Sequence, residues 1–111
     1  MPKPLELLQG TLDMLILKAV SLGLRHGYGI WLRIHKISGN RLQIQQRSLY
    51  LALYHLERRT HRERGESGNK RKAKWYRLTA GGRRTLQAKI KNWNSMAEVI
   101  AGVLNAQPEK L

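Results

Sequence analysis

Apolar residues recur with the period of an α-helix in several stretches of this chain. In the first stretch, residues 11–22, they share one face of a helix at spacings of three and four. These side chains are Leu12, Leu15, Ile16, Ala19 and Val20. Met14 and Leu17 add apolar surface on other faces. We therefore expect a central helix with Thr11 as its N-cap and Gly23 at its end.

Two further helices are predicted, over residues 27–37 and 47–59. Their apolar faces are Ile30, Trp31, Ile34 and Ile37 in the first, and Leu49, Ala52, Leu53 and Leu56 in the second. The segment Ser38-Gly39-Asn40 is a stop signal between them, and residues 42–44 alternate like a very short strand. The exposed side of the 47–59 helix offers Arg, Ser and Tyr side chains, which suit phosphates and base edges.

The C-terminal half holds a polar, glycine-containing segment, then a basic and aromatic stretch with strand character, residues 70–78. Thr79 caps a long helix, whose first turn is weakened by Gly81 and Gly82. The apolar residues of this helix are spaced 4, 3, 4, 3 and 4, and they are Leu86, Ile90, Trp93, Ala97, Ile100 and Leu104. This is an a/d heptad seam, which predicts a dimer interface made by these residues.

The order of elements is typical of a winged helix-turn-helix with a C-terminal extension. We expect a mainly α fold with a small β wing and a long C-terminal dimerisation helix. The predicted DNA-binding domain covers residues 5–79, the dimerisation helix covers residues 80–105, and residues 106–111 form a flexible tail.

The chain is strongly basic, and its positive charge is unevenly distributed. The 111 residues include 21 Lys and Arg against 7 Asp and Glu, a formal net charge of +14. The basic residues are densest between Arg58 and Lys91, where only Glu63 and Glu66 oppose them. Such a stripe indicates a polyanion binder, because each neutralised phosphate releases condensed counterions. An anionic membrane surface or an acidic protein would also suit this charge.

The remaining chemistry of the chain is sparse. There is no cysteine, and the four histidines, His26, His35, His55 and His61, form no H-x-x-x-H pair. Acidic residues are few, and no nucleophile elbow or phosphate-cradling glycine loop appears. We predict no enzyme activity, no metal site and no cofactor. No segment has a signal-peptide layout or spans a bilayer, so we expect a cytoplasmic protein without membrane contact.

Ordered motifs run through residues 5 to 104. They are Leu8-Gln9-Gly10-Thr11-Leu12-Asp13-Met14-Leu15-Ile16-Leu17, His26-Gly27-Tyr28-Gly29-Ile30, Ser48-Leu49-Tyr50 with Ala52-Leu53 and Leu56-Glu57, Arg71-Lys72-Ala73-Lys74-Trp75-Tyr76-Arg77-Leu78-Thr79, and Gly82. In this order they resemble the PadR family of bacterial transcriptional regulators, most of all its short form with a single C-terminal helix. The resemblance implies a homodimeric DNA-binding repressor, often released by a small ligand.

The predicted DNA contacts fall on two segments. Base readers and phosphate contacts at the start of the third helix are Gln45, Gln46, Arg47, Ser48 and Tyr50, and phosphate clamps in the wing are Lys70, Arg71, Lys72 and Lys74. The resemblance places Ser48 and Tyr50 on the DNA side. From its position alone, Tyr50 fits the rim of the core equally well, and Tyr54 is expected at that rim.

The chain departs from the family pattern at two places. Leu51 stands where the family usually has proline, and leucine is the better helix former. At residues 60–64, Thr-His-Arg-Glu-Arg replaces the usual glycine and apolar strand. We therefore expect the first strand of the wing to be absent or irregular, which would leave Trp75 or Tyr76 without a cross-strand partner.

Alternatives remain open on this pattern. The heptad seam could pack back on its own domain instead of on a second chain, and Trp93 could line a small aromatic effector site between protomers in place of anchoring the interface. The leading functional hypothesis is a sequence-specific dimeric regulator of double-stranded DNA. A non-specific nucleic-acid-binding module with the same fold, or a protein-interaction module with a degraded wing, are the alternatives.

Overall fold

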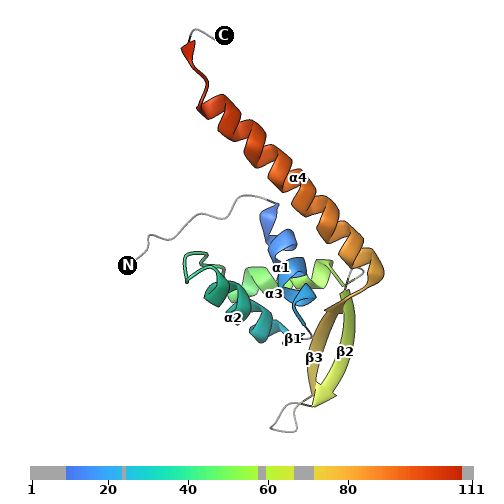
Figure 1. Ribbon diagram of the computed structural model, residues 1–111. Coiled ribbons are helices and arrows are strands. Elements are labelled where there is room, and N and C mark those ends of the chain that lie inside the picture. Colours follow the sequence, from blue (N-terminus) through green and yellow to red (C-terminus); the bar gives the residue numbers. More distant parts are fainter. Residues whose placement is uncertain (1–9, 24, 58–59, 67–71, 109–111) are drawn as a thin grey trace.

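Helices precede and follow a small antiparallel sheet in the computed structural model, which describes residues 10–23, 25–57, 60–66 and 72–108. The elements in chain order are α1 (Thr11–Ser21), β1 (Arg25–His26), α2 (Gly27–Ile37), α3 (Gln46–His55), β2 (Thr60–Glu66), β3 (Lys72–Leu78) and α4 (Ala80–Leu104). The predicted fold class, mainly α with a β wing and a long C-terminal helix, is confirmed (Figure 1).

The N-cap of the central helix α1 lies one residue earlier than predicted. Gly10 is the N-cap, with φ 85°, and Thr11 is already the first helical residue. A left-handed φ is accessible to glycine at no steric cost, so Gly10 provides the turn into the helix. Ile16 and Leu17 are fully buried, which places α1 in the middle of the fold as expected.

One hydrophobic core joins the helices to the sheet. The buried apolar residues are Ile16, Leu17, Ala19, Val20, Ile30, Ile34, Ile44, Leu49, Leu53, Leu56, Tyr76, Leu78 and Leu86. The core thus draws on α1, α2, α3, β3 and the beginning of α4. Burial of these side chains supplies the main favourable term for folding.

The connection between α2 and α3 is held by side chains of α2. The Nε1–H of Trp31 donates to the carbonyl oxygen of Ile44 at 2.6 Å, and the backbone N–H of Ile44 donates to Nε2 of His35 at 3.4 Å. Asn40 takes a left-handed φ of 63° in the same connection. Of the short strand predicted at residues 42–44, only Leu42 takes part in an isolated β-bridge, because the backbone groups of Ile44 bond to side chains of α2.

The sheet has three strands in the order β1-β3-β2, all antiparallel. Its shortest strand, β1, was not expected from the sequence. It pairs Arg25 with Tyr76 and His26 with Trp75. The wing hairpin is therefore attached by β3 to the residues that lead into α2.

The wing has a complete first strand, and the expectation of an absent or irregular one is wrong. β2 pairs with β3 from Thr60↔Leu78 to Glu66↔Lys72 without interruption. Strand pairing is made by backbone N–H and C=O groups, and an edge strand needs no apolar alternation. Trp75 and Tyr76 accordingly have register partners on both sides, Glu63 and Arg62 in β2 in addition to those in β1.

The long helix α4 starts as predicted. The hydroxyl of Thr79 accepts a hydrogen bond from the backbone N–H of Gly82 at 2.9 Å, and the helix continues to Leu104. Its first turns pack near α1, and its C-terminal half extends away from the rest of the chain (Figure 1). Within the ranges that the structure describes, no helix combines the length and apolar character needed to cross a membrane.

Candidate DNA-binding interface

The helix α3 has two opposite faces. Leu49, Leu53 and Leu56 follow one another at spacings of four and three and are buried in the core. A second set has the same spacing on the opposite side, and we call it the outward row: Arg47, Leu51 and Tyr54. Leu51 is 59% exposed and Tyr54 is 67% exposed. The expectation that Tyr54 lies at the rim of the core is therefore wrong.

The start of α3 presents polar groups to the outside. Gln45, Gln46, Arg47 and Ser48 are all exposed, and the N-cap residue Gln45 makes no side-chain capping hydrogen bond. The first turn contains no acidic residue. The first N–H groups of a helix have no partner within the helix and carry its partial positive charge, so this end is suited to a phosphate oxygen.

Tyr50 is partly exposed and partly packed against α2, so it has features of both environments expected for it, the outer surface and the rim of the core. It is 45% exposed, yet its ring covers Gly27, the buried first residue of α2. A Cβ atom on Gly27 would overlap Cε1 of Tyr50 and would lie 3.1 Å from Cδ1. The ring of Tyr50 is thus seated against the backbone of α2, with a large part of its surface still open.

His26, the residue before Gly27, connects α2 to the wing. Its Nδ1 accepts a hydrogen bond from the backbone N–H of Gly29 at 3.1 Å, which makes it the N-cap of α2. Its ring also meets the Trp75 ring edge-on, with 5.1 Å between centroids and 75° between planes. Two consecutive residues therefore contact two different elements: Gly27 contacts α3 through Tyr50, and His26 contacts the wing through Trp75.

The predicted wing clamps are described in part. Lys70 and Arg71 lie outside the described residues. Lys72 and Lys74 lie on β3, at register positions opposite Glu66 and Arg64 of β2. Farther along β3, Tyr76 is buried in the core, and Trp75, on the other face of the strand, is half-buried.

The predicted seam of α4 divides into two parts. Leu86 is 6% exposed within one chain and belongs to the domain's own core, and Ile90 packs partly against that core. Beyond them α4 presents an apolar face that the described part of the chain leaves largely exposed, increasingly so towards Leu104. This α4 face consists of Trp93, Met96, Val99, Ile100, Val103 and Leu104, and Ala97 is exposed beside it.

The α4 face is wider than an a/d seam. Met96, Val99 and Val103 were not singled out in the sequence, although their spacings of three and four run parallel to the seam. Their exposures are 50%, 63% and 71%. A broad, exposed apolar surface of this kind marks an interaction site on a soluble protein.

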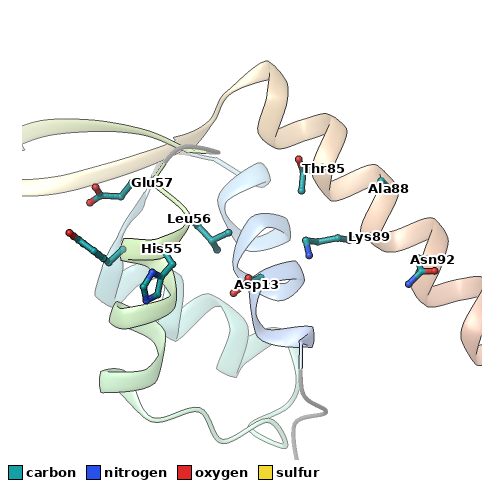
Figure 2. Close-up of a pocket in the computed structure, with 9 residues that line it drawn as sticks. Asp13, His55, Leu56, Glu57, Thr85, Ala88, Lys89 and Asn92 are labelled. Atoms are coloured by element: carbon teal, nitrogen blue, oxygen red, sulfur yellow. The ribbon is translucent and has the colours of Figure 1, made fainter.

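Among the described residues, a larger and a smaller open cleft lie beside α4, where it approaches the rest of the domain. The larger, of about 940 Å³, lies between α1, the end of α3 and α4, and its lining includes Asp13, Glu57 and Lys89. Figure 2 shows Lys89 extending from α4 towards α1. The smaller, of about 270 Å³, is lined by Met14 and Trp93 among others. In the part of the chain that the structure describes, no three His, Cys, Asp or Glu side chains gather into a metal-binding group.

A bundle of helices with an exposed polar third helix, followed by a basic two-stranded wing, defines a winged helix-turn-helix DNA-binding protein. Residues 16–88 match the model of the transcriptional regulator PadR-like family. The chain therefore belongs to the PadR-like family of transcriptional regulators, as its motifs indicated.

Individual proteins are also similar to this chain over most of its length. A protein of Lysinibacillus sphaericus named only as uncharacterized is 31% identical over 97 residues, 86% of this chain and 89% of its own. A solved structure from Streptococcus mutans is 28% identical, with a TM-score of 0.77, over 96% of this chain and 95% of its own. The solved structure of a PadR family transcriptional regulator from Eggerthella lenta is 25% identical, with a TM-score of 0.75, over 89% of this chain and 86% of its own.

Proposed function

We propose that this PadR-family regulator is a homodimeric repressor that binds a palindromic operator. The observation that carries the proposal is the double-faced α3, whose buried leucines hold it in the core while its outward row and polar start remain open. A helix presented in this way can enter the major groove and contact base edges.

The α4 face supports the homodimer. Its exposed apolar side chains would lose their contact with water if two copies of α4 packed together about a two-fold axis. In this arrangement Trp93 and Ile100 lie in the interface, while Leu86 and Ile90 stay with their own domain. Two DNA-binding domains related by this axis would read half-sites about 10 bp apart, or a multiple of that spacing.

The DNA contacts divide by type. Arg47, with Gln46, Ser48 and Tyr50, would read bases, and Gln45 at the N-terminus of α3 would contact a phosphate. Lys70, Arg71, Lys72 and Lys74 of the wing would hold the backbone of the duplex. The net charge of +14 favours this binding by the release of counterions from the DNA.

A small aromatic effector is proposed to act at the dimer interface. The cleft lined by Met14, Trp93 and Met96 lies at the beginning of the α4 face, where sulfur and indole surfaces suit a flat apolar ring. Occupation of this cleft would change the packing of α4 and, with it, the separation of the two DNA-binding domains.

The test is the selection of bound genomic fragments at near-physiological salt, followed by competition between the selected site and random duplex. The proposal expects a palindromic site and a specificity ratio of at least about 10³. A ratio near one would overturn it and favour a non-specific binding module. Light scattering on the purified protein at micromolar concentration tests the dimer, and a monomer would favour pairing of α4 with a different chain.

A further inference from the structure

Leu51 lies in the middle of the outward row of α3. Arg47 precedes it by one helical turn, Tyr54 follows by about one turn, and the buried leucines are on the opposite side. A helix of this fold that enters the major groove does so with its exposed face, so Leu51 would be among the side chains nearest to the base pairs.

Leu51 has no part in the packing of the domain. It is 59% exposed and belongs neither to the core cluster nor to the partly buried residues that pack against it. By contrast Leu49 and Leu53, on the same helix, are almost completely buried. The stability of the fold therefore does not explain an aliphatic side chain at this position.

The major groove offers one apolar partner. Each base edge there presents hydrogen-bond donors and acceptors, and only thymine adds a methyl group, at C5. An aliphatic side chain pressed against the polar edges of a G·C pair would desolvate groups without bonding them, at a cost in free energy. Against thymine, the same side chain buries a methyl group.

Resting on the proposed DNA-binding function, we propose that Leu51 is a specificity-determining residue that selects thymine through its C5-methyl group. Arg47, one turn earlier on the same face, is the neighbouring base reader. One helical turn separates the two residues, about 6 Å along the axis. Since base pairs repeat every 3.4 Å along B-DNA, the selected thymine lies about two base pairs from the base that Arg47 reads.

The experiment replaces thymine by uracil, one position at a time, in the operator recovered by genomic selection. Uracil lacks only the C5-methyl group. Dissociation constants are measured at one fixed salt concentration for the full-length parent protein and for Leu51→Ala. At one position in each half-site, uracil is expected to weaken the binding of the parent protein to the operator by about fourfold, which corresponds to the loss of one buried methyl group. The affinity of Leu51→Ala is expected to be the same for both bases.

Two controls make the comparison specific. Leu22→Ala removes a leucine of similar exposure, 50%, from the C-cap of α1, and this variant is expected to keep the full uracil effect. Circular dichroism checks that Leu51→Ala retains its helices, which is expected because alanine is a good helix former.

The outcomes separate this inference from the function on which it rests. A specificity ratio near one for the parent would overturn both. A specific operator with equal uracil effects in the parent and in Leu51→Ala would overturn only the role of Leu51. A Leu51→Ala variant that binds every form of the operator as the parent does would also overturn it, and would point to a protein partner at this position.

Discussion

The aromatic ring of Tyr50 on α3 is seated on the backbone of Gly27, the first residue of α2. Any side chain at residue 27 would occupy the place of the ring. Gly27 is thus a positioning residue for Tyr50, and through it for the outer surface of α3.

The first prediction concerns this contact. Gly27→Ala should force the Tyr50 ring to move, lowering the free energy of unfolding by about 1–3 kcal/mol, as for other over-packed sites. Operator affinity should fall as far as it does in Tyr50→Ala. Because Tyr50→Ala vacates the space, Gly27→Ala should cost little more in that background, which a double-mutant cycle of urea midpoints and dissociation constants measures.

A matched glycine serves as control for that cycle. Gly102 lies within α4, and a Cβ atom there would meet nothing within 4 Å. Gly102→Ala should stabilise the protein by up to about 1 kcal/mol and leave operator affinity unchanged. If Gly27→Ala and Gly102→Ala have the same effect on DNA binding, Gly27 does not position Tyr50.

The hydrogen bond between Trp31 and the Ile44 carbonyl gives a second prediction. Trp31→Phe keeps an aromatic ring but removes the 2.6 Å bond that holds the connection leading to α3. We expect a loss of about 1 kcal/mol in the free energy of unfolding, the usual value of one such bond, measured by chemical denaturation. Tyr28→Phe, whose ring stacks on Trp31, is the control and should change stability little.

The two faces of α3 predict losses of stability of very different size for the same substitution. Leu49→Ala removes a fully buried side chain and should cost about 2–5 kcal/mol of stability. Leu51→Ala removes an exposed one and should stay within about 0.5 kcal/mol of the parent. Thermal or urea unfolding checks this, and comparable losses in both variants would contradict the assignment of the two faces.

The α4 face predicts the oligomeric state. Ile100→Glu would place an unpaired carboxylate in the proposed interface, which costs several kcal/mol when buried, so light scattering should show a monomer with intact circular dichroism. Ser95 lies on the other side of α4 and is exposed. Ser95→Glu should therefore remain a dimer, and a dimeric Ile100→Glu protein would rule out this interface.

The wing predicts a change in the salt dependence of binding. Lys72→Ala with Lys74→Ala should weaken binding to all duplexes and reduce the slope of log K against log salt by up to about 2. The exposed Lys91 of α4 provides a control, and Lys91→Ala should keep the parent slope. Equal slopes for the wing variant and the parent would show that these lysines make no phosphate contact.

Local pattern predicted much of the helical structure. The bounds of α2 and the Thr79 cap of α4 were correctly predicted, because periodicity and capping depend on residues a few positions apart. The polar start of α3 was recognised in the same way, although the helix begins at Gln46 and ends at His55, earlier than expected. These features also carried the resemblance that identified the family.

Contacts between distant segments could not be read from the same patterns. The edge strand β2 forms because β3 supplies its backbone partners, although residues 60–64 lack an apolar alternation. The heptad spacing predicts which side of α4 is apolar. Only the folded structure shows that Leu86 is covered by its own domain while Ile100 is exposed.

The sequence by itself determined the helices, the basic wing segment and the family of this protein. Each of these depends on residue type and on spacing over a few positions, and none depends on contacts between distant segments. Only the tertiary structure decided that Leu51 and Tyr54 face outwards, that Tyr50 is seated on Gly27, and that His26 joins α2 to Trp75. Those relationships depend on which surfaces the core leaves uncovered once its own apolar residues are buried.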